Sequence, residues 1–341
     1  MKYLVIGLGN TGMSLISMLK YARLPVQGYN RQGKTLENIK QLTEIKVDGL
    51  IDFSFKTDFI VEDLKIAIND ADLIFICVPA YEHESLAKTL SKINFKSSLP
   101  PMILLPGRVF GAINFKQYLG HDVAESQTVP YAARYDHEGL VSIYAKKTNI
   151  IYSSPNIALI QNISEKLPPF LNKIFTSEND YKAVTLSNVG LVLHCAPLLF
   201  NSGLIYSDYD FMFYKDLVSK EIAFYMEQID YERLKICNNL GVYSSSVALW
   251  LEEQYEAKDS SNLYRALHTT NAYLKIISPK TLDHRYLKED LVYGLVPLEK
   301  LATNLGINVP YLSNLIDTAC MLINQDFRKN YTGAIPDWES M

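Results

Sequence analysis

The sequence has 341 residues, which predicts two domains because one domain typically holds roughly 150 residues. Hydrophobic residues make up 48% and charged residues 21%, as in an ordinary globular protein, and this composition excludes a disordered chain. The 33 lysines and arginines nearly balance the 37 aspartates and glutamates, without any block of like charge. Nucleic acid and anionic membranes are therefore not expected as partners.

The four cysteines lie far apart, without the CxxC spacing of a metal site or a redox pair. Each lies in an apolar stretch, so we expect small buried side chains at Cys77, Cys195, Cys237 and Cys320. The six histidines show no HExxH or clustered spacing, and we therefore expect no catalytic metal.

Two segments bear on the location of the protein. Met1 leads directly into the strand-like residues 2–6, without a basic leader or a signal-type apolar region, which predicts a cytoplasmic protein. Residues 183–207 carry no formal charge and are long enough to span a bilayer. Because this stretch contains asparagines, a histidine and a proline, we expect a buried helix whose polar residues face a cavity, and no membrane span.

The first half alternates short apolar runs with amphipathic stretches, which is typical of βαβ units around a parallel sheet. The expected strands are residues 3–7, 26–29, 49–53, 73–78, 102–105, 123–127 and 141–145. The expected helices are residues 11–21, 35–43, 61–69, 84–93 and 157–170.

From about residue 182 the strand-length runs give way to long periodic stretches, such as residues 215–239 and 311–325. A polar run at residues 176–180 precedes this change. We therefore predict an α/β plus all-α protein, with a parallel-sheet domain over residues 1–180 and an all-helical domain over residues 181–341.

The first expected strand ends in a GxGxxG motif, Gly7-Leu8-Gly9-Asn10-Thr11-Gly12, which lies directly before an amphipathic helix. In this context Gly7 permits a tight turn, Gly9 lets the backbone approach a pyrophosphate, and Gly12 lets the helix pack on the strand. The helix N-terminus, which includes Asn10 and Thr11, directs free N–H groups at the anion. The motif indicates dinucleotide binding by a Rossmann-type domain; the alternative is a purely structural glycine turn.

Residues after two other strands are expected to contact the cofactor. Asn30 and Arg31 stand where NAD-specific proteins usually place a carboxylate for the ribose hydroxyls. Such a carboxylate would repel a 2'-phosphate, whereas Asn30 and the Arg31 guanidinium can bind one, so we expect NADP(H) to be favoured over NAD(H). The alternative is a solvated Arg31. Val78 and Pro79 follow a later strand, where a Rossmann chain passes beside the nicotinamide ribose.

The uncharged stretch contains three polar residues, Asn188, His194 and Asn201, whose spacing places them on broadly one side of a helix. Together they are candidates to line a cleft, and Pro197 should kink the helix there. Taken alone, His194 has the alternative interpretation of a satisfied core histidine.

Further along the chain, Arg285 precedes Asp290 by five residues. An arginine of this kind can bind a substrate carboxylate through two hydrogen bonds. An aspartate can fix the orientation of a histidine and raise its basicity for proton transfer. The alternative is a local ion pair between Arg285 and Asp290.

Together these residues resemble the octopine/nopaline (opine) dehydrogenase family over nearly the whole chain. In the first half the matching motifs are Pro79-Ala80 with His83, Pro106-Gly107-Arg108 with Gly111, and the run from Ala124 to Arg134. In the second half they are Ser187-Asn188, His194, Leu199 to Gly203, Asp230-Tyr-Glu232-Arg233 with Leu240-Gly241-Val242, and the run from Arg285 to Pro297.

The resemblance implies an NAD(P)H-dependent reductive condensation of an α-keto acid with the amino group of an amino acid, giving an N-(carboxyalkyl) amino acid. It implies His194 as the catalytic histidine, Asp290 as its acidic partner and Arg285 as the carboxylate-binding arginine. Asn188 and Asn201 are the further substrate-binding candidates. It also implies a helical domain of the type found at the C-terminus of 6-phosphogluconate dehydrogenase. The expected partners are two small-molecule substrates, and a homodimer is left open.

Two departures from the family concern detail. Cys195 and Ala196 follow His194, where some relatives have proline, and the chain is short for the family. The identity of the substrates therefore does not transfer.

Two other functions remain as alternatives. One is a reductase of a single carbonyl, of the ketopantoate reductase or 6-phosphogluconate dehydrogenase type. Such enzymes use a lysine on the first helix of the second domain, and residues 183–207 contain none. The other is a non-catalytic NADPH sensor, against which the joint presence of His194, Asp290 and Arg285 argues.

Overall fold

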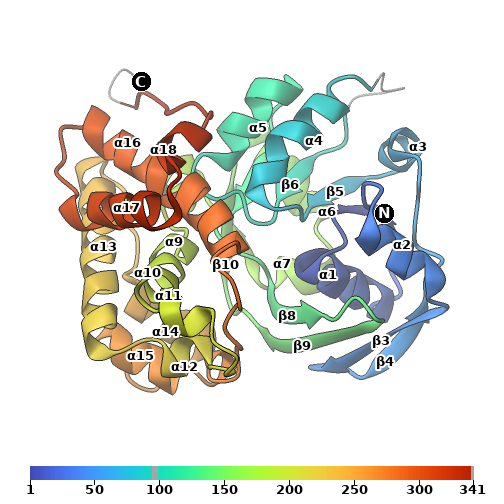
Figure 1. Cartoon of the computed structure of the whole chain (residues 1–341). Coiled ribbons are helices and arrows are strands. Elements are labelled where there is room, and N and C mark those ends of the chain that lie inside the picture. The colour runs from blue at the N-terminus through green and yellow to red at the C-terminus, as the bar shows by residue number, and fades with distance from the viewer. Residues whose placement is uncertain (94–98, 339–341) are drawn as a thin grey trace. The chain divides into compact units, whose positions relative to one another are not determined.

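The computed structural model describes residues 1–93 and 99–338, which divide into two compact units (Figure 1). The first unit comprises Met1–Gly107 and Gly111–Val184, and the second comprises Arg108–Phe110 and Thr185–Met341. The short segment Arg108–Phe110 therefore packs with the second unit, although the chain on both sides of it belongs to the first.

The first unit is built on a seven-stranded sheet in the order β11-β10-β7-β6-β5-β1-β2. Neighbouring strands run parallel, except that β10 and β7 are antiparallel. Strands β1 and β5 are apolar and buried along their whole length, as expected at the centre of a parallel sheet. The strands are β1 (Tyr3–Ile6), β2 (Val26–Tyr29), β5 (Leu73–Ile76), β6 (Met102–Leu104), β7 (Ala124–Ser126), β10 (Ile150–Ser153) and β11 (Phe175–Ser177).

Helices connect these strands, as the alternating sequence pattern predicts. Helix α1 (Asn10–Tyr21) contacts β1 and β2 and also the strands of a second sheet, so it lies between the two sheets of this unit (Figure 1). The other helices are α2 (Lys34–Gln41), α3 (Leu64–Asn69), α4 (His83–Leu90), α5 (Gly111–Leu119), α6 (Ile157–Lys166), α7 (Pro169–Asn172) and α8 (Tyr181–Thr185), with the 3-10 turn η1 (Ala80–Glu82) before α4.

The second sheet has the order β4-β3-β9-β8 and was not predicted as a separate sheet. Its strands are β3 (Glu44–Gly49), β4 (Phe53–Lys56), β8 (Tyr131–Tyr135) and β9 (Leu140–Lys146). The prediction of a strand over residues 49–53 is wrong, because this segment is the turn between β3 and β4. Gly49 has φ +97°, a left-handed conformation that ends the strand.

Two predicted helices are interrupted. The predicted helix over residues 157–170 ends at Lys166, because Leu167 precedes Pro168 and takes an extended conformation with ψ 136°. The predicted helix over residues 215–239 divides into α12 (Phe213–Asp216) and α13 (Lys220–Asn239). The hydroxyl of Ser219 accepts a hydrogen bond from the N–H of Ile222 and so begins α13.

Apart from one bridge between Met212 and Ile277, the regular structure in the described part of the second unit is helical, as predicted. The long helix α13 contacts α9, α10, α15 and α17 and forms the centre of the unit. The other helices are α9 (Gly190–Leu193), α10 (Cys195–Phe200), α11 (Ser202–Ile205), α14 (Val247–Tyr255), α15 (Leu263–Thr269), η2 (Asn271–Tyr273), the π-helix η3 (Tyr286–Leu295), α16 (Val296–Asn304), α17 (Pro310–Ile323) and α18 (Phe327–Asn330).

The apolar stretch that follows β11 is broken and buried. Residues Tyr181–Phe200 are long and apolar enough to cross a membrane, with a mean hydropathy of 1.7, but 83% of that window is buried inside the fold. The chain there forms three short helices, α8, α9 and α10. The stretch is therefore a buried core segment of the fold.

The motif Asp230-Tyr-Glu232-Arg233 on α13 organises the backbone of the helical unit. Arg233 is fully buried and donates hydrogen bonds to the carbonyl oxygens of Leu186 (3.0 Å) and Ser245 (2.7 Å). Asp230 accepts a hydrogen bond from the first N–H group of α14, and Glu232 accepts two from the start of α17. These charges satisfy backbone groups that helix ends leave without partners.

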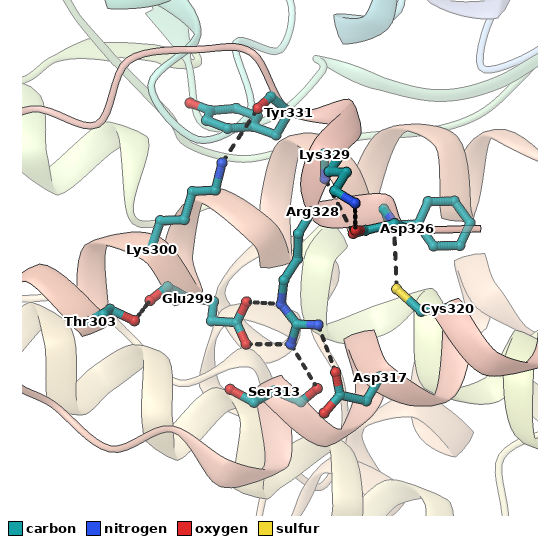
Figure 2. Close-up of polar contacts among 11 residues, drawn as sticks. Glu299, Lys300, Thr303, Ser313, Asp317, Cys320, Asp326, Arg328, Lys329 and Tyr331 are labelled. Atoms are coloured by element: carbon teal, nitrogen blue, oxygen red, sulfur yellow. Dashed lines mark hydrogen bonds and ion pairs between the residues drawn. The ribbon is translucent and has the colours of Figure 1, made fainter. Parts of the chain in front are cut away.

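A second arginine ties the last helix to the unit (Figure 2). Arg328 on α18 donates two hydrogen bonds to Glu299 on α16, at 2.6 and 2.7 Å, and one to Asp317 on α17, at 2.6 Å. Paired hydrogen bonds between an arginine and a carboxylate fix the relative orientation of the two side chains. The contact therefore holds α18 against α16 and α17.

Candidate active site

The turn between β1 and α1 carries the glycine motif, and its three glycines meet different steric demands. Gly7 has φ +99°, and a Cβ atom there would lie 2.9 Å from the backbone of Val78. A Cβ atom on Gly12 would lie 1.8 Å from the carbonyl oxygen of Gly7. Gly9 faces open space, with nothing within 4 Å of a Cβ position. The turn is therefore tight on the protein side and open where a phosphate would approach.

Helix α1 begins at Asn10, and no side chain in the described residues caps its first N–H groups. These groups and the positive end of the helix dipole are therefore available to an anion. Thr11 is partly exposed at the same helix end. The open face at Gly9 and the uncapped helix together fit the pyrophosphate of a dinucleotide.

The two asparagines predicted to bind the cofactor make backbone contacts. The side-chain oxygen of Asn30 accepts a hydrogen bond from the N–H of Leu8 (3.0 Å), and its nitrogen donates to the carbonyl of Arg31. The side-chain oxygen of Asn10 accepts from the N–H of Tyr135 (2.9 Å) on β8. Both asparagines thus hold the glycine turn in place.

Arg31 follows β2 and is paired with a carboxylate. Its two terminal nitrogens donate to the two carboxylate oxygens of Glu82, each at 2.7 Å. Glu82 belongs to η1, which follows β5, and β2 and β5 flank β1 on opposite sides. The Arg31 side chain is 72% exposed, so its guanidinium can exchange this partner for another anion.

Val78 and Pro79 follow β5 directly and are partly exposed. The backbone of Val78 lies beside Gly7, and the carbonyl of Pro79 accepts a hydrogen bond from the N–H of Glu82 (2.9 Å). In a parallel sheet these positions lie at the same edge as the glycine turn, because β5 is the parallel neighbour of β1.

In the helical unit, His194 lies at a break between α9 and α10. Pro197 has no N–H to donate to the carbonyl of Leu193, and its ring crowds that carbonyl, so the helix is interrupted at His194. The kink predicted at Pro197 is therefore a full break, and the prediction that the three polar residues share one side of a single helix is wrong. Asn188 precedes α9, and Asn201 lies between α10 and α11.

His194 and Asp290 form a hydrogen-bonded pair. The Nδ1 atom of His194 lies 2.8 Å from Oδ2 of Asp290. The aspartate side chain is 1% exposed and that of the histidine 13%. The other carboxylate oxygen, Oδ1, accepts a hydrogen bond from Arg108 at 2.5 Å.

Burial and neighbouring charges shift the pKa values of both His194 and Asp290. Burial raises the pKa of Asp290, but Arg108 and His194 outweigh it and lower the pKa to about 2. Burial lowers the pKa of His194; Asp290 opposes this effect, and Arg285 and Arg108 reinforce it. At neutral pH the pair is therefore an anionic aspartate beside a neutral imidazole, which can accept and return a proton.

Asp290 belongs to the π-helix η3, in which the N–H of Val296 donates to the carbonyl of Leu291, five residues earlier. Residues five positions apart in this register therefore lie on broadly the same face, whereas in an α-helix they would be turned apart by about 140°. Arg285 stands immediately before η3 and Asp290 is five residues later. The π-helical register thus places Arg285 on the side of the helix that presents Asp290 to His194.

Aromatic rings surround the histidine. The ring of Tyr286 stacks on that of His194, with centroids 3.9 Å apart and planes 10° apart. Phe213 and Tyr214 lie at 6.4 and 6.5 Å from it. The guanidinium carbon of the exposed Arg285 lies 5.7 Å from the centre of the Tyr286 ring. The imidazole therefore has an apolar lining on the protein side and a cation nearby.

The structure places the two predicted asparagines differently. The side-chain oxygen of Asn188 accepts from the N–H of Gly190 (3.1 Å) and lies 3.4 Å from the Arg108 guanidinium, which also binds Asp290. The side-chain nitrogen of Asn201 donates to the carbonyls of Pro197 and Leu217. Asn188 thus adjoins the His194–Asp290 pair, and Asn201 holds the end of α10.

Comparison with known proteins shows similarity to one family. A family model for the alpha-helical domain of NAD/NADP octopine/nopaline dehydrogenases matches residues 177–323. An opine dehydrogenase from Arthrobacter sp. (strain 1C) is 28% identical over 334 residues, which cover 96% of this chain and 92% of that protein. The chain is similar to the octopine/nopaline dehydrogenases, over its helical domain by the family model and over nearly its whole length by this relative.

Solved structures share the fold. Octopine dehydrogenase in complex with NADH and agmatine has a TM-score of 0.73 at 19% identity, covering 97% of this chain and 95% of its own. Yersinopine dehydrogenase with NADP+ bound has a TM-score of 0.74 at 15% identity, covering 100% and 99%. The predicted family and the predicted class of fold, a parallel-sheet domain followed by a helical domain, are both confirmed.

Arg108 and Glu289 adjoin the site without having been predicted as site residues. Both are buried, and Nη2 of Arg108 lies 3.1 Å from the carboxylate of Glu289. The sequence contained one signal, an arginine directly after the Pro106-Gly107 pair at the end of a strand. Glu289 had none, because its burial depends on the π-helical register.

Proposed function

We propose that this protein is an opine dehydrogenase that joins an α-keto acid to the amino group of an amino acid and reduces the product with NAD(P)H. The observation that carries the proposal is the buried His194–Asp290 pair, with Arg285 on the same side of the π-helix, in a chain of this family. Arg285 can hold a carboxylate beside a group that transfers protons, and both substrates of this reaction bear carboxylates.

The residues of the helical unit have distinct roles in this proposal. Arg285 binds a substrate carboxylate, and Asn188 supports the site from the start of α9. His194 gives a proton to the leaving hydroxyl of the carbinolamine, so that water departs and the imine forms. Asp290 fixes the imidazole through Nδ1 and stabilises its protonated form. The aromatic lining limits the access of water to the imine.

The residues of the first unit hold the dinucleotide in this proposal. The glycine turn and the uncapped start of α1 bind the pyrophosphate, and Val78 and Pro79 lie along the same sheet edge. When bound, NAD(P)H supplies the hydride that reduces the imine carbon. Turnover requires this cofactor and the substrates held by the helical unit to meet.

We further propose that NADP(H) is favoured over NAD(H). No carboxylate follows β2, where NAD-specific proteins usually have one; Asn30 and Arg31 occupy that position. Because Asn30 is engaged by the backbone, the proposal rests on Arg31, whose exposed guanidinium can bind a 2'-phosphate. Arg31 must then exchange Glu82 for the phosphate.

A cytoplasmic location accompanies the proposal and is supported by the burial of the apolar stretch Tyr181–Phe200. The expected partners are the two small substrates and the cofactor. A homodimer is a further hypothesis, which light scattering of the purified protein would check.

The decisive experiment follows the absorbance of NADPH with pyruvate, α-ketoglutarate or oxaloacetate, each with and without a panel of amino acids. Oxidation that requires both substrates supports the proposal and begins to name the substrates. Oxidation with a keto acid alone overturns it in favour of a single-carbonyl reductase. NADPH binding without oxidation across a complete amino-acid panel overturns it in favour of a sensor.

A further inference from the structure

The carboxylate of Asp290 is shared between two partners. Its Oδ2 atom faces His194, and its Oδ1 atom accepts a hydrogen bond from Nη1 of Arg108 at 2.5 Å. The other terminal nitrogen of Arg108 lies 3.1 Å from Glu289. The side chains of Arg108 and Glu289 are 8% and 3% exposed, so this arginine bridges two neighbouring carboxylates out of contact with bulk water.

The backbone of Arg108 is held in an unfavourable conformation. Arg108 has φ +66° and Phe110 has φ +63°, in the left-handed region that costs residues with a Cβ atom about 1 kcal/mol or more each. Two hydrogen bonds hold the segment there: the N–H of Val109 donates to the carbonyl of Tyr293 in η3, and the N–H of Phe110 donates to the hydroxyl of Thr185. Strain of this kind persists where the surroundings demand a particular placement of the side chain.

At the start of α9, next to the His194–Asp290 pair, the space that a side chain would fill is occupied by the Arg108 guanidinium and the Asp290 carboxylate. A Cβ atom on Gly190 would lie 2.6 Å from Oδ1 of Asp290 and 2.7 Å from Nη1 of Arg108. The first residue of α9 is therefore a glycine where the arginine and the aspartate meet. Three separate elements, the strained loop, the start of α9 and the π-helix, thus converge on one guanidinium.

The charges around His194 show what this guanidinium does. Without it, the buried carboxylate of Asp290 would face the imidazole with no cation on its other oxygen and would favour the protonated imidazole, because opposite charges attract strongly where water is excluded. A fixed cation on Asp290 offsets that attraction. Arg108 therefore lets the imidazole release its proton while Asp290 still orients the ring.

Arg285 also lowers the pKa of His194, but its guanidinium is exposed and lies beside the ring of Tyr286. The buried cation that is paired with Asp290 is Arg108. Other titratable groups on the elements packed around the pair include Tyr286 and Glu289 on η3, Cys195 on α10, Tyr214 on α12, Asp230, Glu232 and Arg233 on α13, and Tyr311, Asp317 and Cys320 on α17.

We propose that Arg108 is a positioning residue of the reaction, which fixes Asp290 against His194 and offsets its charge so that the imidazole can both accept and release a proton. This inference rests on the proposed function of His194 as the proton-transfer group. It goes beyond that function because it assigns control over the protonation of His194 to Arg108, a residue from a separate loop.

The test measures the titration of His194 directly, without substrate. The protein has six histidines, which are few enough to follow by NMR after 13C labelling of the imidazole rings, and the His194→Gln variant identifies the signal of His194. In Arg108→Gln the midpoint of His194 should move to higher pH by about half a unit or more, because a cation near it is lost. In Arg265→Gln, which removes an exposed arginine of the same unit, the midpoint should not move.

Arg108→Lys keeps the charge and gives a second test if Arg108→Gln does not fold. Its His194 midpoint should stay near that of the wild type, whereas kcat should fall by about tenfold or more, because an ammonium group cannot reproduce the planar, two-armed contact that the guanidinium makes with both carboxylates. KM for NADPH should change less than about twofold. An unchanged His194 midpoint in folded Arg108→Gln, or full kcat in Arg108→Lys, would overturn the inference.

The experiments distinguish a failure of the proposed opine dehydrogenase function from a failure of the proposed role of Arg108. A shifted His194 midpoint in a protein that joins no keto acid to an amino acid would refute the opine dehydrogenase function and leave the electrostatic role of Arg108 in place. An unshifted midpoint in an active opine dehydrogenase would refute the role of Arg108 alone.

Discussion

The Nδ1 atom of His194 lies 2.8 Å from the carboxylate of Asp290, although 96 residues separate the two in the sequence. Because Nδ1 is engaged, Nε2 is the ring atom left to exchange protons with a substrate. The carboxylate is itself held by Arg108, so the orientation of the imidazole is fixed through a chain of buried contacts.

We expect His194→Gln to lower kcat of the reductive condensation by about 10²-fold or more, because the group that transfers protons is lost. The KM for NADPH should change little, since the dinucleotide is assigned to the first unit. Steady-state kinetics with His268→Gln as the matched control checks this, because the ring nitrogens of His268 contact the backbone carbonyls of Tyr264 on α15 and Lys215 on α12. Near-normal turnover in His194→Gln would remove the residue from the mechanism.

Cofactor preference should respond in opposite directions to the two residues of the Arg31–Glu82 ion pair. Arg31→Ala should weaken NADPH binding about tenfold or more and NADH binding much less, because a charge-assisted contact to the 2'-phosphate is lost. Glu82→Gln should strengthen NADPH binding, because it frees Arg31 and removes a negative charge near the phosphate. Fluorescence titration of both nucleotides measures this, and equal effects on NADPH and NADH would contradict the preference.

Gly190 should tolerate no side chain. In Gly190→Ala the new Cβ atom would meet Asp290 and Arg108 at 2.6 and 2.7 Å, so we expect a loss of about 1–3 kcal/mol in the free energy of unfolding. Gly203→Ala is the control, because nothing lies within 4 Å of its Cβ position and alanine favours a helix. Urea denaturation compares the free energies of unfolding of the two variants. Equal values would contradict the prediction, because Asp290 and Arg108 would then move aside at no cost.

Arg285 should govern the binding of carboxylate substrates. We expect Arg285→Ala to raise KM for the keto acid or the amino acid by about tenfold or more, with a smaller effect on KM for NADPH, because an ionic hydrogen bond to a carboxylate is lost. Lys288→Ala is the control, since this exposed residue of the same π-helix pairs with Asp283. Unchanged KM values for both carboxylate substrates would refute the role.

Local sequence signals predicted the parts of the fold that depend on local physics. The glycine turn, the buried strands β1 and β5, and helix α17 follow from motif and hydrophobic pattern, which act over a few residues. The second sheet could not be predicted in the same way, because β3 gains its partner β9 about a hundred residues later. The short strand β4, which has mixed burial, pairs with β3 and so depends on the same sheet.

The site residues likewise fall into those that the sequence predicted and those that only the structure reveals. The resemblance to the family supplied His194, Asp290 and Arg285. The pattern of the stretch predicted one helix kinked at Pro197, whereas the structure has two helices with a break at His194. The π-helix has no sequence signature in this chain, and without its register Arg285 and Asp290 appear on different faces. Arg108 acquires its role from contacts with residues far along the chain, which spacing cannot reveal.

The pH dependence of the reaction should carry the signature of a histidine that resists protonation. Burial lowers the pKa of His194 below its ordinary value of 6.5, Asp290 opposes the shift, and Arg285 and Arg108 reinforce it. Oxidation of the opine requires the neutral imidazole as a base, so kcat/KM in that direction should rise with pH, with a midpoint below 6.5, and then level off. The condensation requires the protonated imidazole, so its kcat/KM should fall as the pH rises through the same midpoint. Profiles of kcat/KM against pH in both directions test this. In His194→Gln both the rise and the fall with pH should disappear. A midpoint above 6.5 in the wild type would contradict the electrostatics of the site.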